Sequence, residues 1–188
     1  MSCIEDYKAD LIKAIKRVSV VSIDTMNYML RRACRARNTV FIFGNGGSAT
    51  TASHLMCDFQ KGLFESTGKQ FRVICLNDSV CTMSAWANDT DYSEVFANQI
   101  RAFARPNDIV IAISGSGNSP SIIKAVEAAD KLECITWGWT GGTGGELVKA
   151  AQNSIIVKSD NMQIIQDVHL SIGHMIYIDL IKEKESET

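Results

Sequence analysis

The side chains in this chain best suited to acid–base chemistry are histidines that stand near other polar groups on predicted helices. His54 and Asp58 are four residues apart in a segment of helical period, so they share one helix face. Gln166 and His174 are eight apart in a second such segment, about 80° around the helix axis, and we expect them to point into one pocket. An imidazole beside a carboxylate or an amide can act as acid and base, or bind zinc.

The third histidine, His169, lies about 140° around the same helix from His174, so we expect it to face elsewhere. A single helical histidine usually fills a core or interface position. That explanation does not account for two helices that each present an imidazole together with a polar partner. The pattern therefore indicates a functional site.

A loop with three serines, Ser114, Ser116 and Ser119, follows an apolar run and forms a second candidate site. Its glycines let the backbone approach an anion, and the helix that Pro120 opens offers unpaired N–H groups and a positive dipole. A polar turn with a serine cap explains one hydroxyl more easily than three. The loop therefore favours binding of a compact phosphate monoester.

The glycine-rich segment 44–48 follows another apolar run, and Gly44-x-Gly46-x-x-Ala49 satisfies the dinucleotide-binding fingerprint. That fingerprint needs an acidic residue about 20 positions further on. Asp78 is instead 34 residues past Gly44. A dinucleotide also leaves the serine loop unexplained, so a dinucleotide-binding enzyme is the less favoured alternative and no nucleotide cofactor is expected. A third glycine-rich stretch, 139–145, is interpreted as a flexible strand-to-helix turn.

Short apolar runs that alternate with segments of helical period must position these loops. The predicted strands are 39–43, 72–76, 108–113, 132–137 and 154–157. Continuous apolar strands separated by helices indicate a parallel sheet covered on both faces. We therefore predict an α/β fold, a three-layer αβα sandwich, with ligands at the carboxyl ends of the strands near the point where strand order reverses. Apolar residues of the N-terminal helices, Met26 and Tyr28 to Leu30, are expected to leave surface for partners.

Composition limits the class of protein. The chain has 188 residues, a net charge of −2 and 46% hydrophobic residues, which suit one soluble domain without a nucleic-acid partner. The six cysteines form no C-x-x-C pair, which is typical of reduced thiols. The N-terminus lacks the apolar core of a signal peptide, and no apolar run reaches the ~18 residues of a membrane span. We expect a cytoplasmic protein that does not bind membranes.

Taken together, these motifs resemble the sugar-isomerase (SIS) domain and, within it, the sedoheptulose-7-phosphate isomerase (phosphoheptose isomerase) family. The resemblance rests on Gly44-Asn-Gly-Gly-Ser48 with His54, Asn88-Asp89, Ser114-Gly-Ser-Gly-Asn-Ser119, and Gln166-x-x-His169-x-x-x-x-His174. It implies one SIS domain over 1–188, with N-terminal helices in 1–37, an α/β core in 38–160 and a long C-terminal helix in 161–188. It further implies a five-stranded parallel sheet and a homotetramer with active sites between subunits.

Carried over position by position, the resemblance assigns several roles. Phosphate would be held by Ser48, Ser114, Ser116 and Ser119, and the sugar would be contacted by Asn45, Asn88, Asp89 and Gln166, with Gly46 and Gly47 completing the first loop. His174 would serve as one acid–base group, and we pair it with Asp58. In zinc-containing members the positions of His54, Asp58, Gln166 and His174 are metal ligands, so Zn²⁺ is the implied cofactor.

The implied reaction is ketose–aldose isomerisation of sedoheptulose 7-phosphate, or a related sugar phosphate, through an enediol. The chain departs from the family pattern at Asp58, where catalytic members have glutamate, and a Thr-Asp pair is not evident at 160–163. Displacing a catalytic group by about 1 Å can cost ~100-fold in rate. Two other classes stay open, a non-catalytic phosphosugar sensor and a protein-binding SIS module. The intact His54, Asp58, Gln166 and His174 favour the enzyme over the protein-binding module.

Overall fold

The computed structural model describes residues 2–182, so the end of the predicted C-terminal helix, 183–188, lies outside the described residues. The elements follow one another as α1 (Cys3–Lys16), α2 (Val20–Ala36), β1 (Thr39–Gly44), α3 (Gly47–Cys57), a π-helical turn η1 (Asp58–Gly62), α4 (Leu63–Thr67), β2 (Arg72–Cys75), α5 (Val80–Asp89), a 3₁₀ turn η2 (Tyr92–Glu94), α6 (Ala97–Phe103), β3 (Ile109–Ser114), α7 (Pro120–Lys131), β4 (Ile135–Gly141), α8 (Leu147–Ala150), β5 (Asn153–Val157) and α9 (Met162–Lys182). Within that range, no helix combines the length and apolar character needed to span a bilayer.

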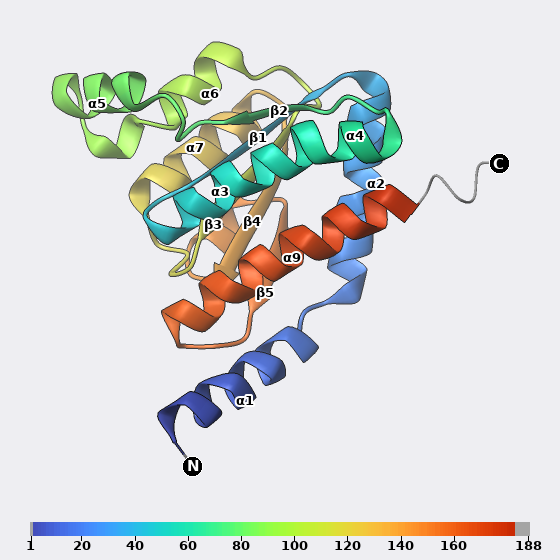
Figure 1. Ribbon diagram of the computed structural model, residues 1–188. Helices are drawn as coiled ribbons and strands as arrows, with labels where there is room; N and C mark the ends of the chain where they lie inside the picture. The colour runs from blue at the N-terminus through green and yellow to red at the C-terminus, as the bar shows by residue number, and fades with distance from the viewer. Residues whose placement is uncertain (1, 183–188) are drawn as a thin grey trace.

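The strands form a single five-stranded sheet in the order β2-β1-β3-β4-β5 (Figure 1). Every pairing is parallel, and Val40 in β1 pairs with Val73 on one side and Ile109 on the other. The predicted five-stranded parallel sheet is therefore confirmed. The chain reverses its direction across the sheet between β1 and β3, so the carboxyl ends of these two strands flank the position where such folds bind ligands.

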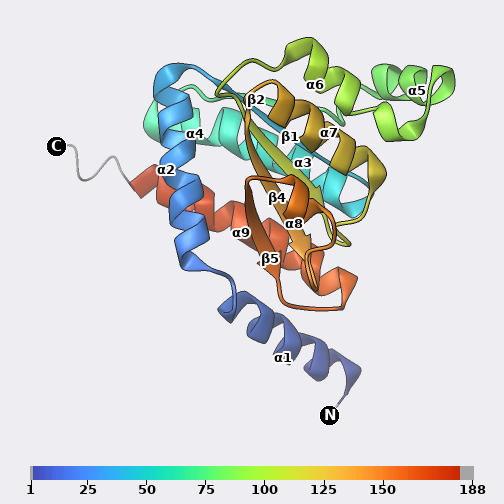
Figure 2. The same ribbon diagram turned by 180° about the vertical axis from the view of Figure 1, so that it is seen from behind.

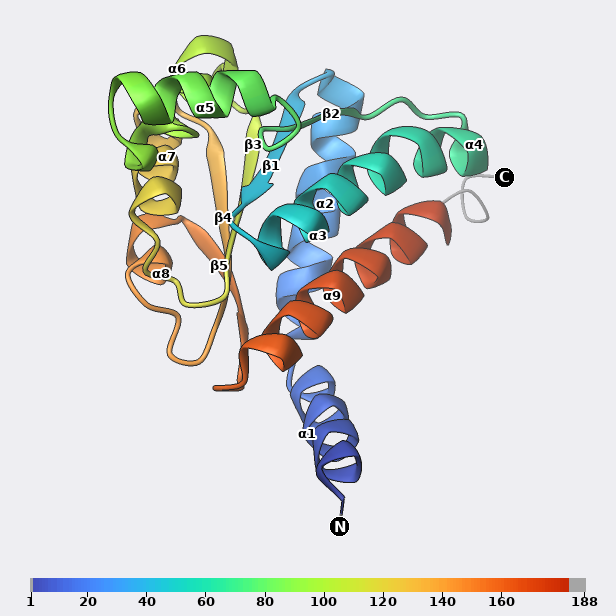
Figure 3. The same cartoon turned by 60° about the vertical axis from the view of Figure 1, so that its left-hand side comes forward.

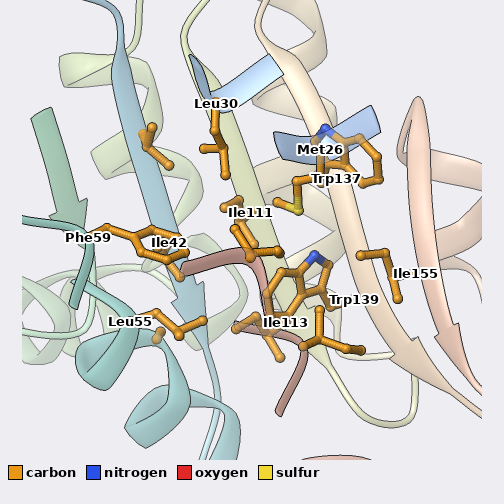
Figure 4. Close-up of a cluster of buried hydrophobic side chains, with 14 of the residues drawn as sticks. Met26, Leu30, Ile42, Leu55, Phe59, Ile111, Ile113, Trp137, Trp139 and Ile155 are labelled. Atoms are coloured by element: carbon orange, nitrogen blue, oxygen red, sulfur yellow. The ribbon is translucent and has the colours of Figure 1, made fainter. Parts of the chain in front are cut away.

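Helices cover both faces of the sheet, with α2, α3 and α9 on one side and α6, α7 and α8 on the other (Figure 3). Successive side chains of β1 point to opposite faces of the sheet, and apolar side chains lie on both. Ile42 packs under α3 and α9, whereas Phe43 packs under α6 and α7, so helices must bury both faces. On the α9 side, Trp137 and Trp139 fill the core beside Ile42 and Leu55 (Figure 4). The three-layer αβα sandwich is confirmed.

Helix α2 lies along the α9 side of the sheet, whereas α1 extends away from the sheet and contacts α9 (Figure 2). Tyr7 of α1 donates a hydrogen bond to Asp167 of α9 at 2.6 Å. Met26 and Leu30 are four residues apart on the inner face of α2, and both are fully buried. The expectation that these two residues are left for partners is wrong, because the helical phase turns only Tyr28 of the group outward, where it is 59% exposed.

Two predicted boundaries also change. The strand expected at 132–137 is β4, Ile135–Gly141, because residues before it form a turn in which Glu133 adopts a positive φ of 59°. Trp139 pairs with Ile155, so the first part of the 139–145 stretch is strand, and only its later part is a loop. The helix expected through Lys61 is also interrupted, since α3 passes into the π-helical turn η1 at Asp58.

Candidate active site

The first cluster joins α3, η1 and α9. His54 Nε2 lies 3.0 Å from His174 Nε2, and Asp58 Oδ2 lies 3.3 Å from the first nitrogen and 3.7 Å from the second. The side chains of both histidines are about half exposed, at 49% and 48%, whereas that of Asp58 is 27% exposed. The structure thus brings together both predicted acid–base groups and three of the four predicted metal ligands.

A glycine allows α3 and α9 to approach closely enough to form this cluster. A Cβ at Gly173 would overlap the side chain of Leu55, and these two residues directly adjoin His174 and His54 in the chain. Glycine inside a helix costs about 1 kcal/mol relative to alanine, so close packing explains its presence here. Asp58 opens η1, a π-helical turn of the kind that often occurs at functional sites.

Gln166 is not part of the cluster within one copy of the chain. Its carboxamide lies against Gly47, where an added Cβ would sit 2.5 Å from Gln166 Oε1. The eight-position separation of Gln166 and His174 corresponds to about 12 Å along α9. Their expected convergence on one pocket is therefore not found within one chain. Gln166 instead lies over the first glycine-rich loop.

The serine loop at the end of β3 leaves its hydroxyls close together. Ser114 Oγ donates to Ser119 Oγ at 3.3 Å, and Ser116 Oγ accepts from the backbone N–H of Asn118 at 3.2 Å. Ser119 stands at the N-cap position of α7, but its hydroxyl makes no capping hydrogen bond within the described chain. Capping therefore does not explain Ser119, and a phosphate group remains the chemistry that suits the loop.

The third glycine-rich loop supports the serine loop from behind. The N–H of Leu147 donates to Gly117 O at 2.9 Å, and that of Glu146 donates to Asn118 Oδ1 at 3.0 Å. Gly117 has a φ of +68°, and a Cβ there would overlap the carbonyl of Gly144. The later part of the stretch, 142–145, is therefore the loop, and it supports the serine loop, whereas 139–141 belongs to β4.

The first loop, at the end of β1, is fixed by a residue that the sequence analysis did not select. Asn77, just after β2, donates from Nδ2 to Gly44 O at 2.8 Å and accepts from Gly44 N at 3.1 Å. Ser48 is buried at the start of α3. Asn45 is engaged on both ends of its carboxamide, by Tyr92 at 2.8 Å and by Ser121 at 3.0 Å.

Sequence reasoning missed Tyr92 and Ser121 because neither belongs to a recognisable motif. The predicted sugar ligands Asn88 and Asp89 lie at the exposed end of α5, where Asn88 Nδ2 donates to Asp89 Oδ1 at 2.8 Å. Their contact with a sugar stays a prediction.

His169 faces the core, as its helical phase predicts. The ring is fully buried, and its Nε2–H donates to Thr140 O at 3.2 Å. Burial lowers the pKa of this imidazole to about 4. His169 is therefore neutral at pH 7 and belongs to the packing of α9 on β4.

The fold and these loops define an SIS-domain protein, and the SIS-domain family model matches residues 5–141. The chain is 35% identical over 172 residues to the phosphoheptose isomerase of Thermodesulfovibrio yellowstonii, covering 92% of this chain and 81% of the relative. It is 38% identical over 144 residues to the probable phosphoheptose isomerase of Thermoplasma acidophilum, with coverages of 77% and 79%. The chain therefore belongs to the phosphoheptose isomerase family, a group of phosphosugar isomerases.

A solved structure agrees with this assignment. The phosphoheptose isomerase from Francisella tularensis superposes with a TM-score of 0.90 at 30% identity, and the match covers 96% of this chain and 97% of that one. The N-terminal helices and α9 are thus part of the shared architecture.

Proposed function

We propose that this protein interconverts sedoheptulose 7-phosphate, or a closely related ketose phosphate, with the corresponding aldose phosphate. The observation that carries the proposal is the Asp58 carboxylate held 3.3 and 3.7 Å from two imidazole nitrogens. It occurs in a chain whose relatives are named phosphoheptose isomerases. A carboxylate and an imidazole side by side supply the base and the acid that isomerisation needs.

The phosphate would bind at the serine loop. Ser114, Ser116 and Ser119 offer hydroxyls at the start of α7, where the first backbone N–H groups and the helix dipole favour an anion. Ser48 adds a hydroxyl from the adjacent loop, and Gln166 lies over Gly47 of that same loop. Phosphate binding here would leave the carbonyl end of the sugar to reach the acid–base groups.

The reaction proceeds in two steps, each of which combines two proton transfers. Asp58 removes the C1 proton of the ketose, and the electron pair forms a C1–C2 double bond as His174 protonates the C2 oxygen, giving an enediol. His174 then takes the proton of the C1 hydroxyl as Asp58 returns its proton to C2, which leaves a C1 aldehyde and restores both side chains. Only Oδ2 of Asp58 makes the described contacts with the imidazoles, so Oδ1 is the oxygen we assign to the substrate proton.

The donor set fits zinc. Nitrogens bound to tetrahedral zinc at 2.0–2.1 Å lie about 3.3 Å apart, and the three separations among His54 Nε2, His174 Nε2 and Asp58 Oδ2 run from 3.0 to 3.7 Å. These three residues would hold the ion. When bound, it would occupy the Nε2 lone pair of His174 and supply Lewis-acid polarisation of the substrate carbonyl in place of the proton that His174 donates in its absence.

The position of Gln166 supports the proposed assembly of several copies. Because Gln166 lies about 12 Å along α9 from His174, it could join the cluster only from another copy of the chain. A hollow of about 460 Å³ beside His174 is lined partly by Met175 and Ile178, which are 37% and 50% exposed. Both features support a homotetramer with active sites between subunits. The six free thiols support a cytoplasmic location.

The test is an assay of the purified protein on C5 to C7 ketose phosphates with and without added zinc, accompanied by metal analysis and light scattering. We expect turnover of sedoheptulose 7-phosphate by a species about four times the 20.6 kDa monomer mass. Binding of the sugar phosphate without turnover would identify a sensor instead. Absence of binding would favour the protein-binding module over both phosphosugar functions.

A further inference from the structure

A second hollow lies at the carboxyl ends of β1 and β3, on the α7 side of the sheet. It encloses about 490 Å³. Two of its lining residues, Asn45 and Ser119, are already assigned to the substrate. Other lining residues have no assigned role: Asp91, Tyr92, Ser93, Ser121 and Lys124. The unassigned part of this wall is mainly η2 and its attachments.

The central contact in this wall is a clamp on the Asn45 carboxamide. The hydroxyl of Tyr92 donates to Asn45 Oδ1 at 2.8 Å, and Asn45 Nδ2 donates to Ser121 Oγ at 3.0 Å. Ser121 is almost fully buried, with 2% exposure, so the far side of the clamp is rigid. Tyr92 is half exposed and closes the clamp from the pocket side.

Hydrogen bonds and an ion pair also hold the segment that carries Tyr92 in place. Asp91 Oδ1 accepts from the N–H of Ser93 at 2.8 Å and so caps η2. Lys124 of α7 donates to Ser93 Oγ at 2.6 Å and to Glu94 Oε1 at 2.8 Å. Tyr92 is thus held in place before any ligand arrives.

Orientation matters because the two ends of a carboxamide have almost the same shape but opposite hydrogen-bonding character. With Oδ1 held by Tyr92 and one N–H held by Ser121, Asn45 keeps one N–H donor and one lone pair for the pocket. Without the Tyr92 hydroxyl, the group could rotate and present its ends to a ligand in either order. A sugar hydroxyl would then meet a mixture of donors and acceptors.

We propose that Tyr92 is a positioning residue for the sugar, acting through Asn45 to fix the donor and acceptor that the hydroxylated carbon chain meets. The proposal rests on the function proposed above. It makes η2 a determinant of affinity for the polyol part of the substrate, separate from the phosphate site at the serine loop.

A double-mutant cycle tests this role. Tyr92→Phe keeps the ring but removes the hydroxyl, and we expect KM for sedoheptulose 7-phosphate to rise about 2- to 10-fold, the equivalent of one neutral hydrogen bond. kcat and inhibition by inorganic phosphate should change little. In an Asn45→Ala background the same Tyr92→Phe change should have almost no further effect. Tyr28→Phe changes an exposed tyrosine near the amino ends of the strands, so it is the matched control and should leave KM unchanged.

Several results would overturn the proposal: an unchanged KM in Tyr92→Phe, an equal rise in the Asn45→Ala background, or a fall confined to kcat. A second measurement does not need turnover. The side-chain amide protons of Asn45, assigned in NMR spectra by their loss in Asn45→Ala, should exchange faster with solvent in Tyr92→Phe. Unchanged exchange would refute the clamp itself. A wild type that keeps the clamp but binds no sugar phosphate would refute the proposed function, and with it the role of Tyr92 toward a sugar, while the clamp as a structural feature would stand.

Discussion

His54 and His174 bring their Nε2 atoms to 3.0 Å although 120 residues separate them in the chain. The rings meet edge to face, with centroids 5.2 Å apart and planes inclined at 62°. A hydrogen bond between two imidazole nitrogens needs one N–H and one lone pair, so the rings must differ in their tautomer or protonation state. A metal ion would replace that shared proton and allow both nitrogens to present lone pairs.

This geometry predicts zinc binding that depends on both histidines. His54→Ala and His174→Ala should each weaken zinc binding by more than about 100-fold, since losing a direct ligand should cost at least as much as losing an outer-shell partner. Competition with a fluorescent chelator measures the affinity. His169→Gln is the matched control, because His169 is buried on β4 and should leave zinc affinity unchanged.

Zinc should also stabilise the wild-type fold, by about 2.7 kcal/mol when free zinc is 100 times its dissociation constant. The two alanine variants should show almost none of this stabilisation in thermal unfolding. A wild type whose unfolding is indifferent to zinc would contradict the metal site.

The carboxylate of Asp58 gives a second prediction. Asp58→Asn keeps the shape but removes the base, so kcat should fall by ~10²–10⁴. Binding of inorganic phosphate should persist, because the serine loop is untouched. Asp58→Glu should not raise activity if the cluster, with Asp58 Oδ2 already 3.3 Å from His54 Nε2, is built for the shorter side chain. Zinc content must be measured in each variant, since asparagine is the poorer ligand. A fully active Asp58→Asn enzyme would exclude Asp58 as the base.

The sequence predicted the structure best where the relative position of two residues depends on their spacing within one helix, strand or loop. His54 and Asp58 meet because residues four apart share a helix face. Apolar runs indicated all five strands of the sheet, four of them to within one residue at each end. Helical angle was less informative for Gln166 and His174, because it gives direction but not the distance along the axis. About 12 Å of helix rise separates the two side chains within one copy.

Other features depend on contacts between distant segments. Tyr92 and Asn45 are 47 residues apart, and nothing local indicates that they meet. β4 was placed too early because the segment that begins at Leu132 includes a turn, and the strand starts only at Ile135, which pairs with Ile109 of β3. Similarly, Gly173 has no motif of its own, and its role becomes visible only when α3 packs against it.

Gly173 therefore provides a third prediction. A methyl group at Gly173 would overlap Leu55, so Gly173→Ala should force α3 and α9 apart and destabilise the protein by about 1–3 kcal/mol. This loss runs against helix propensity, which favours alanine. Zinc affinity should fall as well, because the same movement separates His54 from His174. Ser171→Ala, two residues earlier on α9, is the control and should preserve both properties. Normal zinc binding in Gly173→Ala would show that the close helix contact does not position the histidines.

The buried His169 gives the last prediction, a loss of stability in mild acid. Burial lowers its pKa from 6.5 to about 4, so the unfolded chain binds a proton at this position between those values while the folded chain does not. The free energy of unfolding contributed by His169 is therefore fully present above pH 6.5 and is lost as the pH falls toward 4, by up to about 3 kcal/mol. Urea unfolding at fixed protein concentration from pH 7.5 to 4.5 measures the slope. His169→Gln can still donate to Thr140 O but does not titrate, so its stability should decline less steeply than that of the wild type. Because His54 and His174 are present in both proteins, the difference between the two slopes reports His169 alone, and parallel slopes would contradict its depressed pKa.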